Sequence, residues 1–201
     1  PESPAIGAYG RSFSANPDSV VFHASIFIEE HRERGILNCC KHFPGHGSAT
    51  TDSHLGMTDV TQTWNETELE PYRQLIAAGV CPMVMSAHVF NQNLDPDYPA
   101  TLSHSILTGI LRDELGFDGI IISDAMEMKA IADHYGLETA IEKSIQAGCD
   151  ILLFSNNISG YHPDIVPEII SIILRLVENG SITEERIRQS YDRIIELKNE
   201  L

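Results

Sequence analysis

The sequence predicts an α/β fold in which parallel βα units follow one another along the chain. Apolar runs of strand length begin near residues 36, 80, 118 and 148, and each is followed by a segment with helical signals. Runs that are apolar throughout are typical of parallel strands buried on both faces by helices. With 201 residues and 42% hydrophobic content, the chain is long enough for one domain with a sizeable core.

Most of the expected elements have recognisable start signals. Asn16-Pro17-Asp18 offers an N-cap and a proline at the first helical position, which predicts a helix to about residue 34. Asn65 and Glu68 have capping-box spacing and predict a helix to about residue 78. The other helices are expected at 103–115, 125–147 with a break near Gly136, 163–178 and 183–200, and the strands at 36–41, 80–88, 119–124 and 150–155.

Four expected strands leave two architectures open. A closed (β/α)₈ barrel needs eight strands and typically about 250 residues. The chain is therefore either an open four-stranded sheet or half of such a barrel, and the hydrophobic pattern alone does not distinguish them.

Charge and composition argue against two classes of partner. A net charge of −16 and a pI near 4.8 disfavour nucleic acid and anionic membranes, which both select clustered Lys and Arg. No apolar stretch approaches the roughly 20 residues that span a bilayer, and no signal peptide is visible at the start. The four cysteines lie in or beside apolar runs without a CxxC pair, so we expect buried free thiols and a reducing compartment, the cytoplasm.

The densest group of titratable residues lies between Lys41 and His54. The segment Lys41-His42-Phe43-Pro44-Gly45-His46-Gly47 follows the first expected strand, and Asp52-Ser53-His54 comes shortly after it. Because the proline and glycines hinder a strand or a helix, we expect a loop at the carboxyl end of a strand, where α/β proteins commonly carry their chemistry.

Parallel strands would bring several polar strand ends to one edge of the sheet. These ends are Lys41 and His42, His88, Asp124, and Ser155 with Asn156. Asp124 is either the N-cap of the following helix or a carboxylate able to attack or stabilise an electron-poor carbon. Lys41 and His42 are suited to hydrogen-bond a polar, uncharged substrate, and a buried, hydrogen-bonded core histidine is the favoured interpretation of His88.

The loop histidines allow two interpretations. Asp52 could fix the tautomer and charge of His54, two residues away, although an ordinary solvated loop gives the same spacing. His42, His46, Asp52 and His54 could also bind zinc. Their spacing matches no compact ligand signature such as HExxH, and there is no GxSxG elbow, P-loop or complete dinucleotide fingerprint, so we expect no metal or other cofactor.

Three segments carry a resemblance to a known family: Lys41 to Gly47, Asp52 to His54, and the run Gly-Phe-Asp-Gly-Ile-Ile-Ile-Ser-Asp-Ala-Met-Glu-Met over 116–128. In this order they resemble glycoside hydrolase family 3, specifically its bacterial β-N-acetylglucosaminidase branch, because the β-glucosidases of the family lack the Asp-Ser-His element. The resemblance implies one partial barrel domain over 1–201, equivalent to strands five to eight of a TIM (β/α)₈ barrel, with the upstream half absent.

The same resemblance implies a substrate and roles for six residues. The substrate would be terminal β-linked N-acetylglucosamine of peptidoglycan- or chitin-derived sugars, in carbohydrate metabolism or peptidoglycan recycling. Asp124 is implied as the nucleophile of a retaining reaction, with His54 as acid/base and Asp52 orienting it. Sugar hydroxyls would be contacted by Arg11, Lys41 and His42.

Two other functions stay open beside this one. The chain could be a metal-dependent hydrolase that uses the loop histidines, or a non-catalytic half barrel that binds sugar or a partner. A half barrel exposes sheet edges and apolar faces, so we also expect association with further copies or with the missing barrel half.

Overall fold

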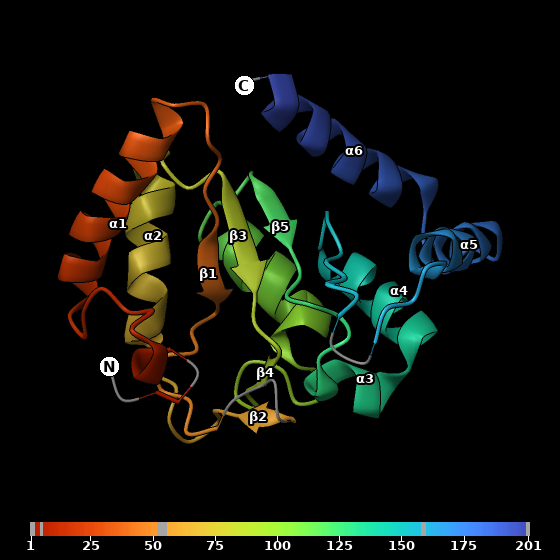
Figure 1. The fold of residues 1–201 in the computed structure, drawn as a ribbon, viewed down its shortest axis with the longest axis horizontal. Coiled ribbons are helices and arrows are strands. Elements are labelled where there is room, and N and C mark those ends of the chain that lie inside the picture. The colour runs from red at the N-terminus through yellow and green to blue at the C-terminus, as the bar shows by residue number, and fades with distance from the viewer. Residues whose placement is uncertain (1–2, 5, 52–55, 158–159, 200–201) are drawn as a thin grey trace.

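A computed structural model describes residues 3–4, 6–51, 56–157 and 160–199. It confirms the parallel α/β fold. Three strands form a parallel sheet in the order β1-β3-β5, comprising β1 (Cys40–Phe43), β3 (Met83–Ser86) and β5 (Ile120–Ile122) (Figure 1). An isolated parallel bridge between Ile122 and Ile151 extends this sheet beyond β5.

The strands are shorter than the apolar runs predict. The first begins at Cys40 rather than at residue 36, since Ile36 and Leu37 remain 50% and 37% exposed and lie outside the strand ladder. In the fourth run only Ile151 forms a bridge. There the backbone N–H of Leu153 donates to the Oγ atom of Ser123 at 2.9 Å, so a side chain replaces a ladder carbonyl.

The helices follow the expected ones closely. The Asn16 side chain accepts a hydrogen bond from the Ser19 backbone N–H at 3.0 Å, which caps α1 as predicted. Gly136, with a φ of 68°, separates two helices where the break was expected. The helices of the described residues are α1 (Pro17–Arg32), the 3₁₀ turn Glu66–Leu69 leading into α2 (Glu70–Ala77), a π-helical segment (Ser105–Glu114), α3 (Lys129–Tyr135), α4 (Leu137–Ala147), α5 (Ile165–Glu178) and α6 (Glu184–Asn199). Two further 3₁₀ turns lie at Gly7–Tyr9 and Ala100–Leu102.

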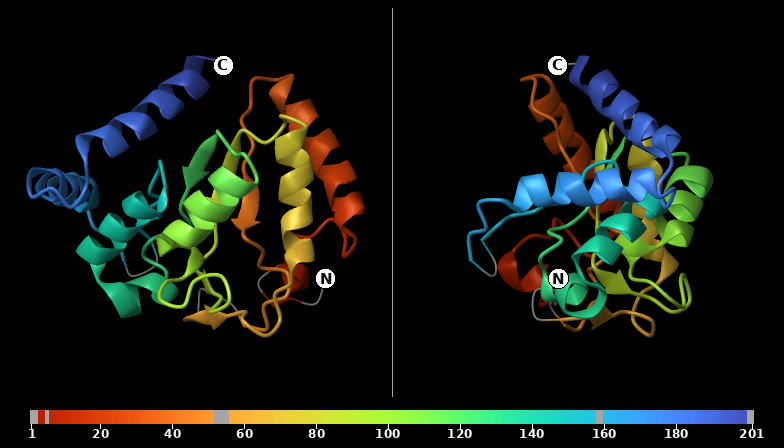
Figure 2. Two further views of the ribbon diagram at one scale, coloured as in Figure 1. Left: turned by 180° about the vertical axis from the view of Figure 1, so that it is seen from behind. Right: turned by 90° about the vertical axis from the view of Figure 1, so that its right-hand side faces the viewer.

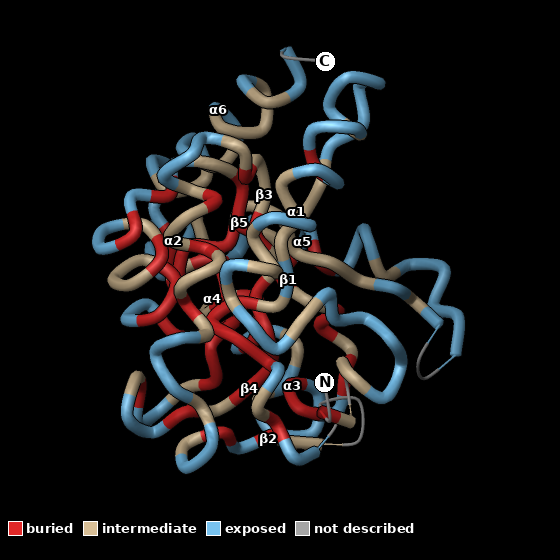
Figure 3. The backbone as a smooth tube through the Cα atoms, turned by 90° about the vertical axis from the view of Figure 1, so that its left-hand side faces the viewer, coloured by how far each residue is buried: buried red, intermediate tan, exposed pale blue. Residues whose placement is uncertain are grey.

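Helices lie beside both edge strands of the three-stranded sheet. Helices α1 and α2 lie together beside β1, whereas α4 and α5 lie beyond β5, and both views from front and back agree on this (Figures 1 and 2). Buried residues gather in the interior of the molecule, whereas the outer helices α1 and α6 are almost entirely exposed or half-buried (Figure 3). Phe43, Val84 and Ile121 are fully buried in the main apolar cluster.

A small second sheet was not predicted. Strand β2 (Thr58–Asp59) pairs in parallel with β4 (Val89–Phe90), and the pair lies at the end of the molecule to which β3 leads (Figure 1). Strands of two residues carry too little alternation to be recognised in a sequence. This pair marks the carboxyl end of the main sheet.

Asp150 ties the end of the chain to the sheet. Its side chain is fully buried, and its carboxylate pairs with Arg112 at 2.7 Å and with Arg193 at 3.2 Å. Ser190 donates to the same carboxylate at 2.7 Å, and the Ile121 backbone N–H donates at 3.0 Å. Because Ser190 and Arg193 belong to α6, this buried carboxylate fixes that helix against β5.

The cysteines and the helix lengths bear on two expectations from composition. All four cysteines are free thiols, as predicted, but only Cys81 and Cys149 are buried; Cys39 and Cys40 are half-buried, so the expected burial is confirmed for two of the four. Within the described ranges, no helix combines the length and the apolar character needed to cross a membrane.

Candidate active site

His42 and Asp124 meet at the carboxyl end of the sheet. His42 belongs to β1, and Asp124 lies two residues beyond β5. The Nε2 atom of His42 is 3.9 Å from the Oδ2 atom of Asp124, and the two side chains are only 11% and 17% exposed. The structure therefore brings these two predicted site residues together, as the parallel arrangement required.

Asp124 is not the N-cap of the helix that follows it. Helix α3 begins at Lys129, and its N-cap residue is Met128. The Oδ1 atom of Asp124 instead accepts a hydrogen bond from the Ala125 backbone N–H at 2.8 Å. One carboxylate oxygen is thus held by the adjoining peptide, while Oδ2 is the atom nearest to His42. The structure excludes the capping alternative left open by the sequence.

The segment after Asp124 is anchored to the fourth run of the sheet. The Met126 backbone N–H donates to the Leu153 carbonyl at 2.9 Å. The Glu127 carboxylate accepts hydrogen bonds from the backbone N–H groups of Ser155, at 3.1 Å, and Asn156, at 2.5 Å. Ser155 and Asn156 therefore reach the same end of the sheet as predicted, and Glu127, which the sequence analysis did not single out, holds them there.

His42 is a neutral hydrogen-bonding group at neutral pH. Burial lowers the pKa of its imidazole from 6.5 to about 4, although the nearby Asp124 carboxylate acts in the opposite direction. Its Nδ1 atom is buried and has no hydrogen-bond partner among the described residues. An uncharged imidazole can donate or accept a hydrogen bond at the site without bringing a buried charge, although Nδ1 itself is shielded from solvent in this structure.

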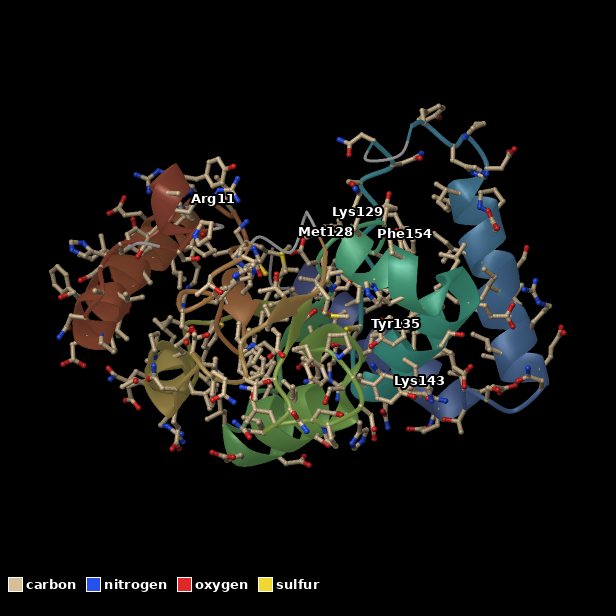
Figure 4. All side chains as sticks on the ribbon, turned by 90° about the horizontal axis from the view of Figure 1, so that it is seen from below. Arg11, Met128, Lys129, Tyr135, Lys143 and Phe154 are labelled. Carbon is tan, nitrogen blue, oxygen red and sulfur yellow. The ribbon has the colours of Figure 1, made fainter. Side chains whose placement is uncertain are left out.

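A cavity of about 560 Å³ opens beside His42 and is also lined by Arg11 and Lys41. Both cationic side chains belong to exposed residues. The Arg11 guanidinium carbon lies 5.0 Å from the centre of the Tyr9 ring, and Figure 4 shows Arg11 on the N-terminal side of the molecule. The three predicted sugar-binding residues thus surround one cavity.

A second cavity of about 600 Å³ lies at the opposite end of the sheet. Its lining includes Pro82 and Asp118, which precede β3 and β5, together with Arg193 of α6. It contains neither His42 nor the loop after it, whereas the smaller cavity is lined by His42 and by residues 45–48, with Asp124 behind His42 and outside the lining itself. The smaller cavity is therefore the better candidate site, because the chemistry of parallel α/β sheets gathers at the carboxyl ends of the strands.

Glu68 holds the loop that follows His42. Its carboxylate accepts hydrogen bonds from the Gly47 backbone N–H at 3.2 Å and from the Ser48 hydroxyl at 2.5 Å. The predicted capping box is therefore only half formed. The Asn65 side chain accepts a hydrogen bond from the Thr67 backbone N–H at 3.1 Å, but the Glu68 carboxylate binds the loop instead of the Asn65 backbone N–H. Capping-box spacing identifies Glu68 in the sequence but does not reveal this contact.

Other contacts fix the backbone of the same loop. The Trp64 indole N–H donates to the Pro44 carbonyl at 3.1 Å, and the Ser3 hydroxyl donates to the His46 carbonyl at 3.1 Å. Gly45 has a φ of 133°, and a Cβ atom added there would lie 2.5 Å from the Glu68 Oε2 atom. Only glycine fits this position without displacing Glu68.

Of the other two loop histidines, His46 and His54, the structure describes only His46. His46 is buried, and its ring centre lies 5.9 Å from that of His42. No group of three His, Cys, Asp or Glu side chains in the described part of the chain could hold a metal ion. Asp52 and His54 lie outside the described residues, so the acid/base pair and the zinc alternative that includes them stay predictions.

His88 is a buried, hydrogen-bonded histidine, as predicted. It is fully buried, and its Nδ1 atom lies 2.8 Å from the Thr101 hydroxyl. Its Nε2 atom lies 3.0 Å from the Ala125 carbonyl oxygen. His88 therefore contacts the residue next to Asp124.

Comparison with known proteins identifies the family. The profile described as Glycosyl hydrolase family 3 N terminal domain matches residues 1–197. The chain belongs to glycosyl hydrolase family 3. Its parallel βα units are accordingly part of the barrel domain of this family.

The most similar family 3 relatives include beta-hexosaminidases. One from Tolumonas auensis is 42% identical over 153 residues, which are 75% of this chain and 46% of that protein. Beta-hexosaminidase A from Pseudoalteromonas piscicida is 32% identical over 217 residues, covering 100% of this chain and 36% of that protein. The chain therefore spans less than half the length of either relative.

A solved structure agrees with this assignment. The glycoside hydrolase family 3 beta-N-acetylglucosaminidase from Paenibacillus sp. str. FPU-7 superposes with a TM-score of 0.86 at 34% sequence identity. The match covers 94% of this chain and 36% of that chain. The shared fold thus extends over nearly all of this chain.

Proposed function

We propose that the chain carries the catalytic residues of a retaining family 3 β-N-acetylglucosaminidase, with Asp124 as nucleophile. The observation that carries this proposal is the 3.9 Å approach of His42 Nε2 to Asp124 Oδ2 at the strand ends. The beta-hexosaminidase names of its relatives support the same activity. We further propose that the four βα units correspond to strands five to eight of the barrel and form one domain.

In the first chemical step, the Oδ2 atom of Asp124 attacks the anomeric carbon of a terminal β-linked N-acetylglucosamine. The bond from that carbon to the leaving oxygen breaks, and the protonated imidazole of His54 gives its proton to that oxygen. A glycosyl ester on Asp124 results. Oδ2 is the attacking atom in this proposal because Oδ1 already accepts the Ala125 N–H.

In the second step, water attacks the same carbon from the face that the leaving group occupied. His54 takes the proton of the water, the ester bond breaks, and Asp124 returns to its carboxylate form. Two inversions give net retention of configuration. Asp52 would hydrogen-bond the imidazole and stabilise its charged form before the first step and again at the end of the second; between the steps the imidazole is neutral and serves as the base.

The cavity beside His42 is suited to an uncharged sugar. Lys41 and Arg11 can donate several hydrogen bonds to hydroxyl oxygens, and neutral His42 can donate or accept one. We propose that these three side chains hold the terminal sugar with its anomeric carbon toward Asp124. The substrates would be sugars derived from peptidoglycan or chitin.

The proposal is tested by the release of para-nitrophenol from its β-N-acetylglucosaminide by the parent chain and by the Asp124→Asn and His54→Ala variants. We expect the His54 variant to lose roughly 10²- to 10⁴-fold in kcat/KM and the Asp124 variant at least as much. Turnover that survives in Asp124→Asn would overturn the proposal. Loss of activity to a chelator and its return with zinc would instead support the metal-dependent hydrolase, and sugar binding without turnover in all three proteins would support the non-catalytic half barrel.

A further inference from the structure

Three fully buried polar side chains lie together beside the Asp124 segment. Ser86 ends β3, His88 follows it by two residues, and Thr101 belongs to the 3₁₀ turn Ala100–Leu102. None of the three lines the cavity beside His42. A buried cluster of hydroxyl and imidazole groups is expensive to desolvate unless its members are hydrogen-bonded, so its partners indicate what it does.

Thr101 is the centre of this cluster. Its Oγ1 atom donates to the Ala87 carbonyl oxygen at 2.9 Å and lies 2.8 Å from the Ser86 hydroxyl. The Nδ1 atom of His88 also lies 2.8 Å from Thr101 Oγ1. The Nδ1 edge of the imidazole ring is therefore anchored to the end of β3 through the hydroxyl groups of Thr101 and Ser86.

The other ring nitrogen reaches the catalytic segment. Nε2 of His88 lies 3.0 Å from the carbonyl oxygen of Ala125, which is 37 residues away in the sequence. A carbonyl oxygen can only accept a hydrogen bond, so Nε2 must carry a proton and act as the donor. The environment thus selects a form of His88 that is protonated on Nε2.

Ala125 is fixed at both of its backbone polar groups. Its N–H donates to Asp124 Oδ1 at 2.8 Å, and its carbonyl accepts from His88 Nε2 and from the Met128 N–H, the latter at 3.0 Å. A movement of Ala125 would therefore change the direction of the Asp124 carboxylate. A continuous chain of contacts runs from Ser86 and Thr101 through His88 and Ala125 to Asp124.

We propose that His88 is a positioning residue for Asp124: its Nε2–H holds Ala125, whose N–H in turn aims the carboxylate so that Oδ2 faces the anomeric carbon. Thr101 fixes the imidazole in the orientation that makes this possible. The inference rests on the proposed role of Asp124 as nucleophile. A displacement of about 1 Å in a reacting group can cost 10²-fold in rate, so this contact belongs to catalysis as well as to folding.

Two substitutions at the same position separate the donor from the bulk of the ring. In His88→Gln, the amide nitrogen can occupy the place of Nε2 and donate to Ala125. In His88→Asn, the shorter amide can reach Thr101 but not Ala125. A matched control is Thr108→Val, which removes one hydrogen bond from a Thr hydroxyl to a carbonyl, that of Ala147 at 2.8 Å, away from this cluster.

The kinetic readout is the separation of kcat from KM in the full chain. We expect His88→Asn to lower kcat by roughly 10- to 100-fold with KM changed less than about twofold, because sugar binding does not use this contact. His88→Gln should recover most of kcat, and Thr108→Val should leave it at the parent value. Equal kcat in the Asn and Gln variants would overturn the proposal.

A spectroscopic readout is independent of turnover. In ¹H–¹⁵N spectra of the full chain, the His88 Nε2–H should give a slowly exchanging signal, and the Ala125 amide should move in His88→Asn but keep its position in His88→Gln. An Ala125 amide that is the same in both variants would contradict the positioning role even if the chain hydrolyses the substrate. A chain without turnover that still shows the Asn-specific shift would refute the proposed function and leave the contact from His88 to Ala125 confirmed.

Discussion

The Nε2 atom of His42 and the Oδ2 atom of Asp124 lie 3.9 Å apart although two complete βα units separate these residues in the sequence. The approach depends on the parallel pairing of β1, β3 and β5, since only parallel neighbours present all their carboxyl ends at one edge. The candidate site is therefore a direct consequence of the topology.

The burial of His42 predicts a pH dependence of stability. Its pKa falls from 6.5 to about 4 on folding, so between these values the unfolded chain binds a proton that the folded chain excludes. Stability from this group is complete above pH 6.5 and is lost as the pH falls toward 4, by at most about 3 kcal/mol at about 1.4 kcal/mol per pKa unit.

Urea unfolding between pH 7 and pH 4.5 measures this dependence. His42→Gln should lose less stability on acidification than the parent, because its side chain takes up no proton in the unfolded state. His104→Gln, at an exposed position, is the control. If the parent and His42→Gln have the same slope, the imidazole is not buried as described.

Replacement of the buried Asp150 is predicted to cost the protein a large part of its stability. Replacement by Asn leaves Arg112, Arg186 and Arg193 around a neutral amide, so we expect the free energy of unfolding to fall by about 3–5 kcal/mol. Asp113→Asn, on the exposed face of the π-helical segment, should change it by less than about 0.5 kcal/mol. Denaturant titration of both variants would reveal the difference, and equal stabilities would show that the ion cluster contributes little.

Replacement by alanine is predicted to destabilise the protein at Gly45 but not at Gly47. Gly45→Ala would place a methyl group 2.5 Å from the Glu68 carboxylate in a backbone conformation with φ of 133°. We expect a loss of about 1–3 kcal/mol in stability and weaker sugar binding, because the loop beside His42 must shift. At Gly47 the added carbon would lie 3.7 Å from the same carboxylate oxygen, so Gly47→Ala should be tolerated. Thermal unfolding and sugar titration of the pair test this, and similar losses in both would count against it.

Helix α5 is predicted to support self-association. Val166, Ile170 and Leu174 follow one another at helical spacing and are 59%, 52% and 57% exposed. We expect light scattering at micromolar concentration to give a mass above the 22.3 kDa of one chain, rising with salt as the net charge of −16 is screened. Ile170→Glu should shift the population toward monomer more than Ser171→Glu does. A single-chain mass for the parent at all concentrations would refute the prediction.

Much of this arrangement could be predicted from local sequence signals. Asn16 and Gly136 have the chemistry of a cap and a helix break, and both act as such. His42 and Asp124 follow apolar runs directly, so the assumption of parallel strands sufficed to bring them together. These inferences depend only on neighbouring residues and on one rule of sheet topology.

Other features depend on contacts that no local pattern contains. Glu68 leaves its expected capping partner for a loop 21 residues away, and Ser123 occupies a ladder position that shortens the fourth strand to one bridge. His88 could be recognised as a buried histidine, but its hydrogen bond to Ala125 follows from packing between two strand ends. Such contacts are decided by tertiary structure, which overrides local preference.

The central claim is that Asp124 forms a covalent bond to the sugar, and mass spectrometry after incubation with a fluorinated N-acetylglucosaminyl fluoride tests it most directly. The carboxylate should displace fluoride at the anomeric carbon and add one sugar per chain. Peptide mapping should then place the ester on Asp124, and Asp124→Asn should stay unlabelled. A label on another carboxylate such as Glu127, full labelling of Asp124→Asn, or no label on a parent chain that binds the sugar would contradict the claim.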